Sequence, residues 1–522
     1  MTKKYKKPGI IIATIVLVSI LLSFILNMVL EQKISKAIAN LPDSVLVDYK
    51  SIDTNIWLGN IEVTMPKIEV KGKNTNEIIL DAKTKTIELN DLSYWEFLVN
   101  DKIDINQIFV NQLIANYKHN SVVKNDSYQA SFIENIKQVI GVNEILINDS
   151  NVLISDYKTD SIIVSVPVLK INLNDLELNP HVEGLKNQIK YSDFSLEAND
   201  LMYAISDFEI LTASLFKFSN NSIDIESLSI KTKYGKTEYS RILKTERDHF
   251  DLSIKEIDFV GLDYGFNEND AFYLISDHIK LNTPEAEIYR DKLVADDITH
   301  KPFYASILRD LDFQLDLKQI NIDNGKISYL EKVNMENPAG RLDFSNMEVI
   351  LTNVSNINAN QPTEIEINTT FMENSILKVD WNFVVANESD EFEFKADLGV
   401  FEVNQLDQFS KSNLNVDLNG ALAQTYFTIS GNKESSRVNL KMKYDDFEVV
   451  ILKKNGKERN KFLSNLVNLI VKDNSRDEGN IYRYGLDETV ERDKTKSVFN
   501  FVWLNVRQGL LDAMTGDGTK EN

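Results

Sequence analysis

The chain contains no cysteine, and among its 522 residues there are only 9 prolines, 19 glycines and 5 histidines. Without cysteine, disulfides, thiolate nucleophiles, iron–sulfur clusters and cysteine-bound zinc are all excluded. The scarcity of glycine and proline excludes collagen-like and proline-rich segments. The remaining composition, 43% hydrophobic and 26% charged, is that of an ordinary globular protein long enough for several folded units.

Sequence motifs for catalysis and nucleotide binding are also missing. There is no G-x-G-x-x-G, no G-x-x-x-x-G-K-[ST] and no G-x-S-x-G, and no two histidines have i, i+4 spacing. Asp473 to Asp477 is similar to a calcium loop, but Glu478 stands where the EF-hand requires glycine. We therefore predict that the protein is not an enzyme and has no cofactor and no metal site. An envelope hydrolase that uses unrecognised carboxylate pairs stays open as a minor alternative.

Charge is distributed unevenly along the chain, which has a formal net charge of -22. Four lysines (Lys3, Lys4, Lys6 and Lys7) precede the first acidic residue, Glu31, so the rest of the chain has 53 basic and 79 acidic residues. Such an acidic body repels phosphates, and no basic cluster with interleaved aromatics offsets it. We predict no nucleic-acid partner.

Residues 10–30 form an uncharged, mostly apolar run. As a helix this run would span roughly 31 Å, the thickness of the hydrocarbon core of a bilayer. We predict a transmembrane anchor over 10–30, with the basic residues 1–9 in the cytoplasm and the body on the far side. A cleaved signal peptide with Ala37-Ile38-Ala39 as its cleavage site is the alternative, although signal peptides have shorter apolar runs. A translocated body without cysteine favours a bacterial inner membrane and the periplasm.

From about residue 45 onward, apolar and polar residues alternate with a period of two, which predicts half-buried β-strands. The clearest run places Leu377, Val379, Trp381 and Phe383 on one face, and similar runs begin at Phe392, Leu414 and Val438. Short polar turns between the runs favour an antiparallel meander over 361–455.

A weak internal repeat relates residues 145–154 to residues 320–329, each interpreted as strand, Asx-rich turn and strand. Such repetition favours an elongated, repetitive sheet. We predict an N-terminal β region over 31–144 and a central one over 145–360.

Helical patterns are few. Residues 132–140 and 462–470 have helical spacing, and a longer amphipathic helix is expected over 498–514, with its apolar residues in an arc of roughly 160°. This arc includes Val498, Phe499, Val502 and Trp503. We expect a C-terminal helical region over 456–515 and a disordered tail over 516–522.

The apolar face of the predicted sheet has two interpretations. It could pack against a second sheet or against helices as an ordinary core. It could also stay open as a trough that shields acyl chains, since its lining is hydrocarbon with no polar group to satisfy. The predicted lining of such a lipid groove consists of Leu377, Val379, Trp381, Phe383, Phe392, Phe394, Leu398, Leu414 and Val416.

Several segments resemble the AsmA-like family of bacterial envelope proteins. Residues 56–63 (IWLGNIEV) and 66–70 (PKIEV) after the lysine-led anchor are similar to the opening of the family. Residues 288–292 (IYRDK), the expected Asp323-Asn324-Gly325 hairpin and residues 499–503 (FNFVW) are similar to its Bacteroidetes members. The likeness is one of pattern and covers nearly the whole chain.

This resemblance implies a mainly β fold: a transmembrane helix, then an elongated, curved antiparallel sheet forming a groove, a few short helices and a C-terminal amphipathic helix. It implies a single-pass inner-membrane protein with a periplasmic body, related to bridge-like lipid transfer proteins. The expected partners are the inner membrane, phospholipid or another acyl-chain lipid, and other envelope proteins, with a role in phospholipid transport to the outer membrane or in its assembly. The alternative is a membrane-tethered β scaffold with a closed core and no lipid cargo. The C-terminal helix is expected to cap the groove, or else to rest on a membrane.

Overall fold

A computed structural model describes residues 44–55, 59–72, 77–93, 96, 100, 102–120, 138–182, 188–268, 271–453, 475 and 482–515. The predicted anchor (10–30), the predicted helix over 462–470 and the tail (516–522) lie outside these residues. Among the helices that are described, none combines the length and the apolar character needed to cross a membrane. The protein is mainly β, as predicted.

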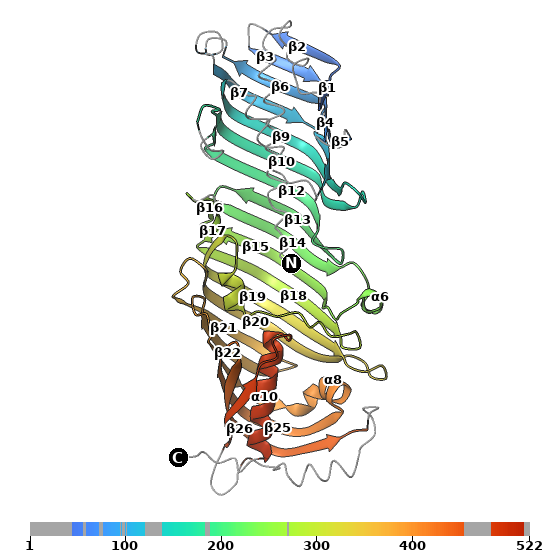
Figure 1. The fold of residues 1–522 in the computed structure, drawn as a ribbon, viewed down its shortest axis with the longest axis vertical. Coiled ribbons are helices and arrows are strands. Elements are labelled where there is room, and N and C mark those ends of the chain that lie inside the picture. The colour runs from blue at the N-terminus through green and yellow to red at the C-terminus, as the bar shows by residue number, and fades with distance from the viewer. Residues whose placement is uncertain are drawn as a thin grey trace. The chain divides into compact units, whose positions relative to one another are not determined.

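The chain divides into two compact units, residues 1–225 and 226–522, with the boundary inside strand β14 (Ser222–Thr232). The described strands of the first unit (Figure 1) are β1 (Val45–Asp48), β2 (Ser51–Asn55), β3 (Asn60–Thr64), β4 (Lys67–Lys71), β5 (Ile78–Lys83), β6 (Thr86–Leu92), β7 (Lys102–Asn111), β8 (Ile114–His119), β9 (Val139–Asp156), β10 (Ile162–Leu178), β11 (Ile189–Lys190), β12 (Asp193–Ala204) and β13 (Glu209–Ser219).

In the second unit, the described strands after β14 are β15 (His249–Val260), β16 (Asp263–Phe266), β17 (Phe272–Ser276), β18 (His278–Asp291), β19 (Gln314–Lys332), β20 (Gly340–Ser355), β21 (Pro362–Phe371), β22 (Ser375–Val384), β23 (Phe392–Leu398), β24 (Phe401–Glu402), β25 (Val416–Gly431), β26 (Ser435–Ile451) and β27 (Arg483–Glu491). Its described helices are α6 (Lys236–Ile242), α7 (Tyr304–Arg309), η1 (Val403–Leu406), α8 (Asp407–Phe409), η2 (Ser410–Leu414) and α10 (Val498–Thr515).

Both units contain the same element of topology, a parallel join between a position made of two short strands and one long strand. Some positions in the sheet are occupied by two short consecutive strands lying end to end, which are written here with a slash. In the first unit the strand order is β1/β2, β3/β4, β5/β6, β7/β8, β9, β10, β12, β13. In the second unit it is β15/β16, β17/β18, β19, β20, β21, β22, β23, β25, β26, β27. Neighbouring rows are antiparallel as predicted, except that β7/β8 runs parallel to β9, and β17/β18 parallel to β19. A parallel join needs a long crossover connection, and α7 lies in the crossover of the second unit.

The weak sequence repeat marks equivalent positions in the two units. Residues 145–154 lie in β9 and residues 320–329 in β19, and each of these strands follows the parallel join. The predicted turn between two strands was wrong in both copies. Asp149 (φ 47°) and Asn324 (φ 54°) are left-handed residues inside single strands of 18 and 19 residues. Asp and Asn tolerate this conformation, so these residues produce a bulge and not a hairpin.

Buried hydroxyl groups bind backbone carbonyls at or next to left-handed residues. Thr369 Oγ1 donates to Ser345 O (2.9 Å), directly before the left-handed Asn346, and Ser276 Oγ donates to Val260 O (3.0 Å), directly before Gly261. The same pattern is found for Ser150 with Asn148 O and for Thr84 with Asn111 O. For Thr363 the acceptor is the carbonyl of the left-handed residue itself, Asn353 O. All five hydroxyl residues are buried, so each hydroxyl needs a partner within the protein and finds it in one of these carbonyls. Three of the carbonyls also accept a backbone N–H: Val260 O from Asp277, Asn111 O from Lys85 and Asn148 O from Gln112.

Three helical predictions have different outcomes. The helix over 498–514 is confirmed as α10. For the helix expected over 132–140, the described residues Val139 and Ile140 begin strand β9, and residues 132–137 lie outside the description. The region 456–515, expected to be helical, also contains strand β27.

Replacing Thr369 by valine removes the buried hydroxyl and with it the hydrogen bond to Ser345 O. We expect the free energy of unfolding to fall by about 0.5–1.5 kcal/mol in chemical denaturation. Thr428→Val is the matched control, because the half-buried Thr428 hydroxyl makes no hydrogen bond with a described residue. Equal stability of the two variants would contradict the role of the hydroxyl.

Candidate functional site

Apolar side chains form two continuous rows across the sheet of the second unit, from β15 to β26. Each member pairs with the next across neighbouring strands. One row is Ile257, Leu281, Ile322, Val349, Ile367, Val379, Ala396, Phe427 and Leu440; the other is Phe259, Ile279, Ile320, Leu351, Ile365, Trp381, Phe394, Ile429 and Val438. We call these two rows the apolar track.

The opposite face of the same strands is polar. The row between the two track rows consists of Asp258, Lys280, Asn321, Ile350, Glu366, Asp380, Lys395, Thr428 and Asn439. Only Ile350 is apolar in this row, so the two faces differ sharply in their affinity for water.

Burial changes along the track. Where it crosses β22 to β26, most of its residues are buried, with Ile429 and Val438 at 0% exposure. Between β18 and β21 six of its eight residues are only half-buried: Leu281, Ile320, Ile322, Leu351, Ile365 and Ile367. The track is therefore closed at one end and partly open at the other.

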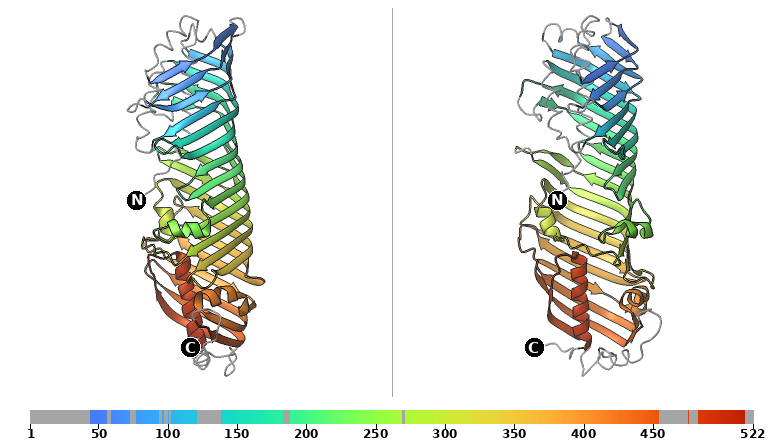
Figure 2. Two further views of the ribbon diagram at one scale, coloured as in Figure 1. Left: turned by 90° about the vertical axis from the view of Figure 1, so that its right-hand side faces the viewer. Right: turned by 45° about the vertical axis from the view of Figure 1, so that its right-hand side comes forward.

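Two helices close the buried end. Val498 and Phe501 of α10 pack on it together with Val502 and Val506, and Phe303, Ala305 and Leu308 add the α7 segment. Figure 2 shows α10 lying across the last strands of the unit, and its contacts are with β25, β26 and β27. The prediction that the C-terminal helix caps this face is consistent with that packing.

The nine residues predicted to line an open groove are mostly part of this closed core. Val379, Trp381, Phe383, Phe392 and Phe394 are all buried at 9% exposure or less. Leu377, Leu398 and Val416 are half-buried, and Leu377 and Leu398 pack against the core clusters near α10. Leu414 lies in η2, before the left-handed Asn415, and is 46% exposed, so the strand predicted there begins only at Val416. The period-two pattern located the correct face, but it contains no information about the helix that covers it.

The half-buried part of the track was missed as a site. Its signal was present in the sequence, since Ile320 and Ile322, Val349 and Leu351, and Ile365 and Ile367 each have period-two spacing. The runs are short because bulges shift the alternation by one residue.

The α10 helix approaches the sheet through glycine and a buried polar residue. Gly509 faces Leu440 and Val438, and Gly485 of β27 faces the backbone of Gly509. Asn505 is fully buried, where it accepts a hydrogen bond from Ser436 Oγ (2.8 Å) and donates to Phe501 O (2.9 Å). As a result, Phe499 and Trp503, expected on the buried side of the helix, are exposed at 62% and 38%.

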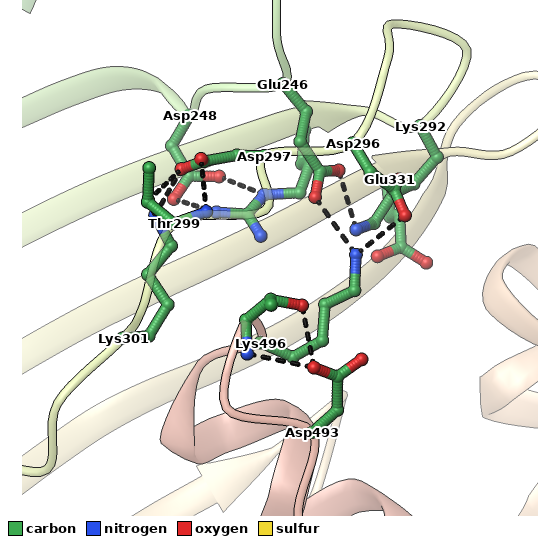
Figure 3. Close-up of polar contacts among 12 residues, drawn as sticks. Glu246, Asp248, Lys292, Asp296, Asp297, Thr299, Lys301, Glu331, Asp493 and Lys496 are labelled. Carbon is green, nitrogen blue, oxygen red and sulfur yellow. Dashed lines mark hydrogen bonds and ion pairs between the residues drawn. The ribbon is translucent and has the colours of Figure 1, made fainter.

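An ion-pair cluster fixes the segment before α10 to the crossover that leads to α7 (Figure 3). The buried carboxylate of Glu246 forms ion pairs with Lys292 Nζ (2.7 Å) and Lys496 Nζ (3.5 Å). Lys496 Nζ also forms an ion pair with Asp296 (3.0 Å). The hydrogen bond to Asp296 raises the pKa of Lys496, so this lysine stays charged. Two further contacts join the segments: Lys301 N donates to Lys494 O (2.8 Å), and the Arg492 guanidinium lies 3.8 Å from the centre of the Phe303 ring.

The first unit also has a row of paired apolar residues, most of them buried, and it contains a hollow. Its row consists of Ile52, Val63, Ile87, Val110, Ile147, Ile171, Leu196 and Phe218. A hollow of about 330 Å³ is lined by Ile171, Leu196 and Phe218 of this row together with polar residues, which include Asn172 and the ion pair of Lys170 with Glu197.

Within the described residues, no group of three or more His, Asp or Glu side chains could hold a metal ion. No protein-family model and no curated protein matches the chain. The AsmA-like resemblance therefore stays a prediction from sequence.

Replacing Gly485 by alanine would drive its Cβ into the carbonyl oxygen of Gly509 and to 3.0 Å from Ala513 N. Because both neighbours are backbone atoms, we expect α10 to shift, with faster proteolysis within residues 498–515 and a lower melting temperature. Gly399→Ala is the control, since its Cβ would meet only Ile376 O at an ordinary 3.5 Å. Unchanged proteolysis in Gly485→Ala would show that the close approach is not required.

Stability should also depend on pH through Asp297. Hydrogen bonds from Lys301 and from the backbone and side chain of Thr299 lower the pKa of Asp297 from 3.8 to about 2. A lowered pKa means that the contribution to stability is complete above about pH 4 and is lost as the pH falls toward 2. In denaturation curves between pH 2 and 5, Asp297→Asn should have a shallower pH dependence than the wild type. Asp312→Asn, which changes an exposed carboxylate without a described ion pair, should leave the dependence unchanged.

Proposed function

We propose that this protein is anchored in the inner membrane with its body in the periplasm, and that it binds lipid acyl chains on the apolar track. Its role would be phospholipid transport to the outer membrane, or assembly of that membrane. The observation that carries the proposal is the half-buried stretch of the track between β18 and β21, which has no polar side chain.

The chemistry of this stretch suits a hydrocarbon chain. Burying an acyl chain there releases water from two apolar surfaces and leaves no hydrogen bond unsatisfied. The four neighbouring strands of the open stretch, β18 to β21, extend it over about 14 Å at about 4.8 Å per strand step. One leaflet contributes about 15 Å to the bilayer core of about 30 Å, so the stretch is about as long as a single acyl chain.

The proposed location in the inner membrane and the periplasm rests on the amino-acid sequence. The apolar run over 10–30, the four lysines before it and the acidic, cysteine-free body support the membrane anchor and the periplasm. The AsmA-like resemblance implies the lipid ligand and the role at the outer membrane. The charged face opposite the track can remain in water while a chain is bound on the other side.

The scaffold alternative is favoured by the closed end of the track, where α7 and α10 produce an ordinary core. In that case the polar face and other surfaces would bind envelope proteins, and no lipid would be carried.

Charges at two adjacent positions of β20 distinguish these proposals. Leu351→Asp places a carboxylate in the open stretch, and Ile350→Asp places the same group on the polar face, where Ile350 is 40% exposed. With the full chain purified from membranes and its lipid measured by native mass spectrometry, we expect Leu351→Asp to lose lipid and Ile350→Asp to keep it. Lipid-free wild type with a stoichiometric protein partner would support the scaffold. Charges at Val379, Trp381 or Phe394 do not test the groove, because they would disrupt the core.

A further inference from the structure

The open stretch of the track ends at Trp381, whose indole is enclosed by aromatic rings. Tyr304 of α7 lies 5.5 Å from it between ring centres, Phe394 5.8 Å, Phe383 6.2 Å and Phe499 of α10 6.4 Å. Trp381 pairs across the strands with the half-buried Ile365, so it directly continues the open stretch. Tyr304 and Phe499 are 40% and 62% exposed, and the site therefore lies close to solvent at the edges of both helices.

The indole nitrogen of Trp381 has no hydrogen-bond acceptor among the described residues. The residue is only 7% exposed, and Nε1 itself is buried. Tryptophan Nε1 is a donor only, and buried tryptophans usually have an acceptor for it. An unpaired buried donor costs free energy, so an acceptor from outside the chain would be bound favourably here.

The surroundings restrict the chemistry of that acceptor. Its four ring neighbours are aromatic, and the track beyond it is aliphatic. An ionised carboxylate would lose its hydration in such a site, whereas a neutral carbonyl loses much less. The ligand must therefore combine a neutral carbonyl oxygen with a long hydrocarbon chain.

We propose that Trp381 binds the ester carbonyl of an acyl-ester lipid, with Nε1 donating to the carbonyl oxygen and the chain lying along the track toward β18. This inference rests on the proposed function and deepens it, because it assigns a polar contact and the class of lipid. It makes Trp381 a specificity residue that favours ester-linked chains over ether-linked ones.

A comparison of two lipids tests the contact in the full-length protein. Dioleoyl phosphatidylethanolamine and its diether analogue carry the same chains, but only the ester lipid has carbonyl oxygens. In competition against a fluorescent lipid, we expect the wild type to bind the ester lipid about three- to ten-fold more tightly, the effect of one neutral hydrogen bond. Trp381→Phe should bind both lipids equally, with the wild-type affinity for the diether. Trp503→Phe, which alters an exposed tryptophan of α10, should keep the wild-type preference.

A spectroscopic measurement supports the test without a substitution at this site. The chain has four tryptophans, so a ¹⁵N-indole spectrum contains few signals. We expect one N–H resonance to shift on addition of the ester lipid and to stay unshifted with the diether.

Three results would overturn the inference. If the wild type binds both lipids equally, or if Trp381→Phe keeps the preference, the carbonyl contact is wrong while lipid binding stands. If the folded wild type binds neither lipid, both the inference and the proposed function are wrong.

Discussion

Four long strands, β9, β19, β20 and β26, keep their apolar side chains on one face because a left-handed residue shifts the alternation by one position at a bulge. In β19, Ile320 and Ile322 precede Asn324, and Ile327 follows it at a position that strict alternation would turn to the polar face. The register shift around Asn324 and Gly325 returns Ile327 to the apolar face. Buried hydroxyls add hydrogen bonds to the carbonyls beside several of the left-handed residues, where the ladder is irregular.

Closure of the track depends on a different set of contacts, all near the C-terminus. The α10 helix can lie close to the sheet because Gly485 and Gly509 leave room for its backbone, and Asn505 is satisfied within the interface. The ion pairs of Glu246 with Lys292 and Lys496 tie the segment before the helix to the crossover before α7. A buried carboxylate with two ammonium partners is costly to separate, so this end of the track is held shut.

Helical spacing predicted the C-terminal helix, and period-two alternation predicted the mainly β fold class and the faces of β22, β23, β25 and β26. It could not predict burial, because α10 and α7 cover the track through tertiary contacts that no local pattern encodes. Nor could it distinguish a bulge from a turn at Asp149 or Asn324, since Asx residues favour both. The orientation of α10 was partly misjudged for a related reason: Asn505 and Gly509 face the sheet because a close approach needs small or hydrogen-bonded groups, and Phe499 and Trp503 are exposed in consequence.

The proposed function requires that the apolar face of the sheet, and not the polar face, contacts lipid between β18 and β21. Because the chain has no cysteine, a single cysteine at Ile320 or at its neighbour Asn321 can carry a benzophenone label at a unique position. These residues lie on opposite faces of β19. After illumination of the labelled full-length protein in membranes, the account predicts lipid cross-links from position 320 and none from position 321. Equal cross-linking from both positions, or none from position 320, would contradict it.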